Sequence, residues 1–117
     1  MRIKMIKILN NIKQLFNRSC NNGLDYAELK KMMKNNLKVN LIDVRSMQEY
    51  NEGHIQNAVN LPIYNLEKSI QQRFKNKNDI IILYCQFEKR SKKGKNILEK
   101  LGYKNVYYLK GGIEEIQ

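Results

Sequence analysis

Residues 79–85 read Asp-Ile-Ile-Ile-Leu-Tyr-Cys, which is the longest uninterrupted apolar run of the sequence together with its two flanking residues. The five residues at 80–84 are apolar without interruption and rich in β-branched side chains, which is typical of a central strand covered on both faces of a sheet. Cys85 follows at the carboxyl end of that predicted strand. Ligands of parallel α/β sheets bind beyond the carboxyl ends of the strands, so Cys85 stands where a functional residue is expected.

Three further short strands are predicted on either side of this stretch. Residues 39–44 form an apolar run around Leu41 and Ile42, residues 58–61 form a brief strand that Pro62 closes, and residues 106–109 supply the last strand. Helical patterns separate these strands, and such alternation requires crossover connections. The sequence therefore predicts a parallel, three-layer α/β domain.

Capping signals mark two of the predicted helices. Asp25 is followed three residues later by Glu28, which predicts a helix that runs to about residue 35. Ser46 and Glu49 have the same spacing and predict a short helix before residue 53.

Two more helices are predicted nearer the carboxyl terminus. One covers residues 66–74. The other contains Ile97, Leu98 and Leu101, with Ser91 as its expected cap and Gly102 at its end.

Residues 1–22 form a separate predicted segment. Apolar residues recur at helical spacing from Met5 to Phe16, with lysine and asparagine on the other side, which predicts an amphipathic helix followed by a loop over 19–23. Its apolar stripe packs on the domain, or residues 1–18 make a weak contact with a membrane surface or a partner. Residues 23–117 are then a single domain.

Composition narrows the classes of function. The 117 residues carry a net charge of +11, but the lysines are spread over the chain without the interleaved aromatic residues of a base-stacking surface, so nucleic-acid binding is not expected. No apolar run is long enough to span a bilayer. Two cysteines without CxxC spacing and a single histidine predict no metal site and no disulfide framework, which fits a reducing, cytoplasmic setting.

The surroundings predicted for Cys85 favour its thiolate form. A cysteine between a strand end and a helix start faces backbone N–H groups and the positive end of the helix dipole. Arg90 and Lys89 add positive charge nearby, so Cys85 is a candidate nucleophile. The structural alternative is an inert cysteine that ends a buried strand.

Three segments resemble the signatures of the rhodanese family in order and spacing. The amino-terminal signature is matched by Ile42-Asp43-Val44-Arg45, Glu49-Tyr50, Gly53-His54-Ile55, Ala58 and Asn60-Leu61-Pro62. The active-site loop is matched by Tyr84-Cys85-Gln86-Phe87-Glu88-Lys89-Arg90-Ser91, and the closing motif by Leu109-Lys110-Gly111-Gly112-Ile113. The resemblance implies a parallel sheet of about five strands flanked by helices, with a loop whose amides hold the cysteine's sulfur cargo.

The resemblance also implies a sulfurtransferase that needs no metal or organic cofactor. Cys85 would take sulfur from thiosulfate or a persulfide and pass it to cyanide or a thiol, so the expected partners are a small sulfur donor and a thiol acceptor, or a sulfur-carrying protein. The implied substrate-binding loop comprises Gln86, Phe87, Glu88, Lys89 and Arg90, and the implied orienting residues are Asp43, Arg45, Glu49 and Ser91. A rhodanese-like binding or redox-sensing module with little turnover is the alternative.

Loop length separates this interpretation from the phosphatases that share the fold. In those relatives the arginine lies six positions after the cysteine, whereas here Arg90 lies five positions after Cys85. The shorter loop suits a sulfur atom better than a tetrahedral phosphate ester.

Glu88 departs from the small or basic residues that are frequent in the loops of the family. Its charge would oppose an anionic donor, unless the side chain turns outward or pairs with Lys89 or Lys92. His54 is expected to have a structural role, and Cys20 is expected to be a bystander thiol, with a resolving cysteine as the alternative.

Overall fold

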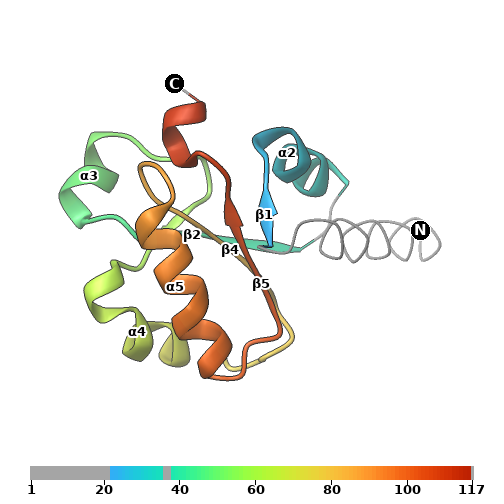
Figure 1. Ribbon diagram of the computed structural model, residues 1–117, viewed down its shortest axis with the longest axis vertical. Helices are drawn as coiled ribbons and strands as arrows, with labels where there is room; N and C mark the ends of the chain where they lie inside the picture. Colours follow the sequence, from blue (N-terminus) through green and yellow to red (C-terminus); the bar gives the residue numbers. More distant parts are fainter. Residues whose placement is uncertain (1–21, 36–37, 117) are drawn as a thin grey trace.

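The computed structural model describes residues 22–35 and 38–116 (Figure 1). Within this part of the chain, five strands form one sheet in the order β1-β5-β4-β2-β3, and every pairing is parallel. The strands are β1 Gly23–Leu24, β2 Val39–Asp43, β3 Val59–Asn60, β4 Ile80–Tyr84 and β5 Asn105–Leu109. The predicted parallel α/β fold is confirmed, and the apolar run at 80–84 is its central strand.

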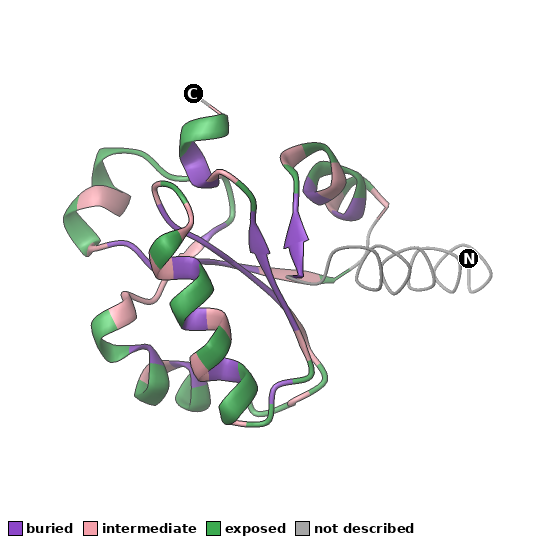
Figure 2. Cartoon of the chain, in the orientation of Figure 1, coloured by how far each residue is buried: buried purple, intermediate pink, exposed green. Residues whose placement is uncertain are grey.

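Helices cover both faces of the sheet. They are α2 Tyr26–Lys34, α3 Met47–Glu52, α4 Leu66–Arg73 and α5 Lys89–Lys100, with 3₁₀ turns η1 Ile63–Asn65 and η2 Gly112–Glu115. Alternate residues of β4 serve the two faces: Ile82 packs with residues of α2 and η2, whereas Ile81 packs with residues of α4 and α5. Figure 2 shows the buried residues concentrated along the strands and on the inner sides of the helices.

Both predicted capping boxes are present. At the start of α2, the amide of Glu28 donates to Asp25 Oδ1 at 2.8 Å, and the amide of Asp25 donates to Glu28 Oε1 at 3.2 Å. At the start of α3, the Glu49 amide donates to Ser46 Oγ at 3.2 Å, and the Ser46 amide donates to Glu49 Oε1 at 3.1 Å. These reciprocal bonds satisfy helix amides that would otherwise lack partners.

Two details differ from the sequence prediction. Gly23, expected in a loop, belongs to β1 and lies opposite Tyr108 of β5. Ser91 is not the cap of α5, because this helix begins at Lys89 and the Ser91 amide is already engaged by Cys85 Sγ. The helix therefore starts three residues earlier than predicted, with Glu88 in place of Ser91 at the N-cap position.

The predicted amphipathic helix over 5–16 and Cys20 lie outside the described residues, and the division into 1–22 and 23–117 stays a prediction. In the described ranges, the helices are too short and too polar for any of them to traverse a bilayer.

Candidate active site around Cys85

Cys85 follows β4 directly and is only 1% exposed. Its Sγ accepts a hydrogen bond from the backbone amide of Ser91 at 3.4 Å and lies 3.6 Å from Ser91 Oγ. Ser91 Oγ in turn donates to the carbonyl oxygen of Glu88 at 2.9 Å. The sulfur is therefore held against the first turn of α5, where helix amides and the helix dipole favour negative charge.

The loop after Cys85 turns its carbonyl groups toward η2. The amide of Ile113 donates to the Cys85 carbonyl at 3.0 Å, and the amide of Glu114 donates to the Gln86 carbonyl at 3.1 Å. A Cβ atom added at Gly112, whose φ is +64°, would lie 2.3 Å from the Phe87 carbonyl oxygen and 2.5 Å from those of Cys85 and Gln86. Glycine is thus required at position 112 both by backbone conformation and by space.

Peptide geometry then sets the direction of the loop amides. In a trans peptide the N–H points opposite to the carbonyl of the same plane. The carbonyls of residues 85–87 face η2, so the N–H groups of residues 86–88 face away from it. Among the described residues, no protein acceptor is hydrogen-bonded to the amides of Phe87, Glu88, Lys89 or Arg90. The loop can therefore donate several backbone hydrogen bonds to an anion.

Asp43 and Arg45 form one ion pair beneath the loop. Arg45 Nη2 lies 2.7 Å from Asp43 Oδ2, and both side chains are buried. The same Nη2 donates to the Gly53 carbonyl at 2.7 Å, and Nη1 reaches the side-chain oxygen of Gln86 at 3.4 Å. Arg45 is thereby oriented between the turn at Gly53 and the loop residue Gln86.

Glu49 and Arg90 form a second, separate ion pair. Arg90 donates to both carboxylate oxygens of Glu49, at 2.6 and 3.1 Å. These bonds lower the pKa of Glu49 to about 2. The pKa of Arg90 is raised, mainly by Glu49 and in smaller part by the charge of Cys85. The predicted set of orienting charges is thus divided: Asp43 holds Arg45, which reaches Gln86, whereas Glu49 holds Arg90.

Glu88 has its charge compensated. Its carboxylate lies 2.9 Å from Lys92 Nζ and accepts a hydrogen bond from the Gly111 amide at 2.7 Å. The bond to Lys92, and then the bond to Gly111, lower the pKa of Glu88. Of the arrangements predicted for Glu88, the pairing with Lys92 is the one observed, and it weakens the expected opposition to an anionic donor.

The side chains of Gln86, Phe87 and Lys89 differ in their exposure and contacts. Phe87 is 61% exposed, and Lys89 is exposed. The side chain of Gln86 lies between Arg45 and Glu114 and bonds to both. The sequence offered Lys92 as a partner for Glu88, and the two residues lie four apart on the chain. Sequence reasoning missed Glu114, which nothing in the sequence indicated.

His54 contacts Tyr50 rather than the loop. Its ring stacks on Tyr50 with centroids 3.7 Å apart, and its Nδ1 lies 2.9 Å from the Tyr50 carbonyl oxygen. Within residues 22–35 and 38–116, no group of three or more His, Cys, Asp or Glu side chains is placed to bind a metal ion.

Comparison with known proteins identifies the family of this chain. The sequence model of the rhodanese-like domain family matches residues 25–117. The thiosulfate sulfurtransferase PspE of Escherichia coli K12 is 35% identical over 75 residues, which cover 64% of this chain and 71% of that protein. A crystal structure of a rhodanese-like domain protein from Staphylococcus aureus has 30% identity and a TM-score of 0.71, over 78% of this chain and 86% of that one.

Longer proteins also contain a similar segment. The probable molybdopterin-synthase adenylyltransferase of Porphyra purpurea is 36% identical over 91 residues, 77% of this chain but 24% of that protein. A tRNA uridine(34) hydroxylase of Buchnera aphidicola subsp. Acyrthosiphon pisum is 33% identical over 117 residues, 96% of this chain and 36% of that protein. The chain spans about a quarter to a third of these two relatives. By its family match, its sheet topology and its identity to PspE, the chain belongs to the rhodanese-like domain family.

Proposed function

We propose that the protein is a sulfurtransferase that carries sulfane sulfur on Cys85 as a persulfide. The observation that supports this most directly is the position of Cys85 Sγ, 3.4 Å from the Ser91 amide at the start of α5, beside a loop whose carbonyls face η2. A thiolate, and the persulfide formed on it, are both anions that backbone amides at a helix start stabilise.

The reaction takes place as two displacements. In the first, the Cys85 thiolate attacks the outer sulfur of thiosulfate, a bond forms between the two sulfur atoms, and sulfite leaves with the electrons of the broken S–S bond. In the second, a thiolate or cyanide takes the outer sulfur, and the electrons of the broken bond return to Cys85 as thiolate. A persulfide donor enters the first step in the same way and leaves as a thiolate.

The roles of the surrounding residues follow from their contacts. The amides of Phe87, Glu88, Lys89 and Arg90 are the donors available to the outer sulfur, and they need no reorganisation as its charge develops. Ser91 holds the sulfur through its amide. The Asp43–Arg45 pair orients Gln86, and Glu49 orients Arg90, so these four residues position the loop.

Mass spectrometry of the intact protein tests the proposal. After incubation with thiosulfate, the mass should increase by one sulfur atom, and a thiol should remove the gain. Cys85→Ser should abolish it, whereas the matched variant Cys20→Ser should retain it.

A binding or redox-sensing module is the second candidate. Cys85 is 1% exposed while the neighbouring Phe87 is 61% exposed, an arrangement that offers a partner more contact than it offers a small donor. Absence of a sulfur adduct with thiosulfate, glutathione persulfide and a cysteine desulfurase would favour this candidate over the enzyme.

A further inference from the structure

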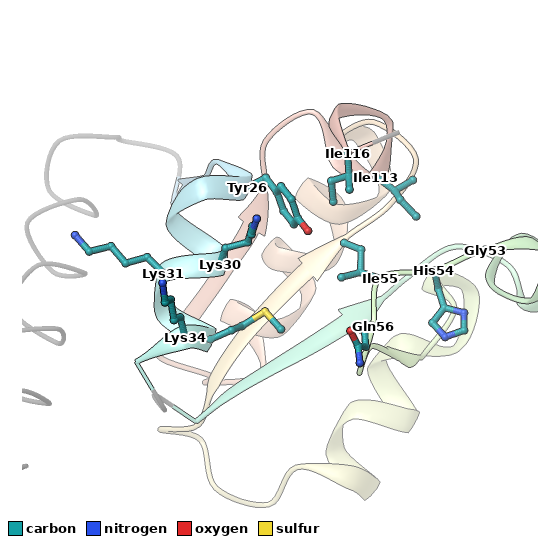
Figure 3. A pocket seen from close by; sticks show the side chains of 11 residues that line it. Tyr26, Lys30, Lys31, Lys34, Gly53, His54, Ile55, Gln56, Ile113 and Ile116 are labelled. Carbon is teal, nitrogen blue, oxygen red and sulfur yellow. The ribbon is translucent and has the colours of Figure 1, made fainter.

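A hollow opens between α2, η2 and the turn at residues 53–56, with a volume of about 620 Å³ (Figure 3). Its apolar lining comes from Met33, Ile55, Ile113 and Ile116. Figure 3 shows Tyr26 and Lys30 on one side and Ile55, His54 and Gln56 on the other. None of the loop residues 85–91 lines it, so this hollow is separate from the surroundings of the Cys85 sulfur.

Three lysines of α2, at positions 30, 31 and 34, line the hollow, and no aspartate or glutamate does. In the described part of the chain no carboxylate forms an ion pair with any of them; Lys30 lies over the Tyr26 ring, 5.4 Å from its centroid. Residues 1–21 contain no aspartate or glutamate that could neutralise them. Lys30 and Lys34 are also four apart, so their like charges disfavour the helix that carries them.

Four carboxylates adjoin lining residues in sequence, at positions 25, 52, 114 and 115, and none of them lines the hollow. Asp25 accepts from the Glu28 amide at 2.8 Å, and Glu115 is exposed. Glu52, which precedes Gly53, lies 3.5 Å from the side-chain nitrogen of Gln48. Glu114, which follows Ile113, accepts from Gln86. The hollow therefore combines an apolar floor with uncompensated positive charge on one wall.

We propose that this hollow binds a small amphipathic anion, an alkyl chain that ends in a carboxylate. The chain would pack on the isoleucines and Met33, and the carboxylate would lie at the lysines of α2. The volume lies within the range of small-molecule sites. The floor is recessed, with Ile113 5% exposed, which suits a single chain better than a membrane surface.

A peptide fits this lining less well than a small molecule. An extended peptide needs backbone partners, and the Gly53 carbonyl in the wall is already occupied by Arg45 Nη2 at 2.7 Å. A bound chain would contact the two segments that hold the Cys85 loop, because Ile113 donates to the Cys85 carbonyl and Gly53 binds Arg45. Occupancy should therefore raise the melting temperature.

Titration with octanoate at low salt, followed by amide NMR, tests the site. We expect shifts at Ile55, Ile113 and Ile116, with 1-octanol binding more weakly because it lacks the charge. Lys30→Gln/Lys34→Gln should raise the dissociation constant for octanoate at least about fivefold. Both side chains are exposed and glutamine is a good helix former, so the fold should persist.

The matched control is Lys68→Gln/Lys93→Gln, which removes the same charge from a different hollow between η1, α4 and α5. This control should change the dissociation constant less than about twofold. Equal weakening in the two double variants, or no shifts at the isoleucines, would overturn the proposal. Binding to anionic vesicles without binding of octanoate would overturn it as well. Cys85→Ser should bind octanoate normally, which separates this site from the sulfur chemistry.

Discussion

At the scale of single residues, the ion pair between Glu88 and Lys92 sets the charge that the Cys85 loop presents to the proposed anionic donor. Lys92 neutralises a carboxylate that stands three residues after Cys85. Lys92→Gln leaves that charge uncompensated, so we expect the thiosulfate rate to fall about threefold or more at low salt, and less at high salt. Steady-state rates at two ionic strengths measure this.

Lys93→Gln is the control for this prediction, since it removes the same charge one residue further along an exposed part of α5. Glu88→Gln keeps the side chain's size and should raise the rate only slightly, because the charge it removes is already paired. A large gain in Glu88→Gln, together with no change in Lys92→Gln, would mean that Glu88 acts on the donor directly.

Glu49 gives the molecule a pH-dependent contribution to stability. Its pKa is about 2 in the folded protein, below the value of about 4.3 for an unperturbed glutamate. A depressed folded pKa adds stability that is complete above the unfolded value and is lost as the pH falls toward the folded one. The melting temperature of Glu49→Gln should therefore lie below that of the wild type above about pH 5, and the two should converge near pH 2.

Glutamine can still accept the capping bond from the Ser46 amide, so the comparison removes the negative charge that Arg90, and in smaller part Ser46, stabilise. Both side chains are about one-third exposed, at 32% for Glu49 and 35% for Arg90, so solvent screening will keep the difference small. A difference that stays constant between pH 2 and pH 7 would contradict the assignment.

At the scale of elements, η2 lies against the backbone of the Cys85 loop, with the amides of Ile113 and Glu114 bonded to loop carbonyls. Gly112→Ala would place a Cβ 2.3 Å from the Phe87 carbonyl oxygen at a φ of +64°, and a backbone atom cannot give way cheaply. We expect a loss of about 3 kcal/mol in the free energy of unfolding, with strongly reduced sulfur transfer.

Gly102→Ala is the matched variant, because its φ is +97° and no atom lies within 4 Å of the added Cβ. It should cost only about 1 kcal/mol for backbone strain. Denaturant unfolding of the two variants measures the difference. If both variants lost the same free energy of unfolding, backbone strain alone would explain the effect of Gly112→Ala, and the close approach to the loop would contribute nothing.

The elements that carried their own local signal were the ones that could be predicted from the sequence. The capping boxes at Asp25 and Ser46 each depend on residues three apart, and both are formed. β1 has two residues, too few for any periodicity, and it exists because Gly23 and Leu24 pair with β5, far along the chain. The start of α5 was misplaced because a contact with Cys85 Sγ, not a capping side chain, engages the Ser91 amide.

The candidate site shows the same division. The position of Cys85 at a strand end could be predicted from the run at 80–84. The partition of charges could not, because Glu49 reaches Arg90 across 41 positions and Gln86 reaches Glu114 across 28. Such pairings form only when the fold brings distant loops into contact, and a local sequence pattern does not predict which loops these are.

At the scale of the whole molecule, the segment before the sheet is open to a direct test. Residues 1–18 lie outside the described part of the chain, and their amphipathic pattern predicts a helix that packs on the domain. Deleting them should lower the melting temperature, because apolar surface would be uncovered. Unchanged melting together with loss of binding to anionic vesicles would instead support the contact with a membrane surface.

The order of the strands also protects this chain from aggregation. The run Ile80–Tyr84, apolar and uncharged, has the composition of segments that assemble into cross-β fibrils. In the fold it is paired on one side with β2 and on the other with β5, and the two edges of the sheet are the two-residue strands β1 and β3. Such short edges offer a second molecule almost no backbone to extend. Fibril formation by this protein should therefore depend on unfolding, at a rate set by the population of chains in which β4 has lost both neighbours.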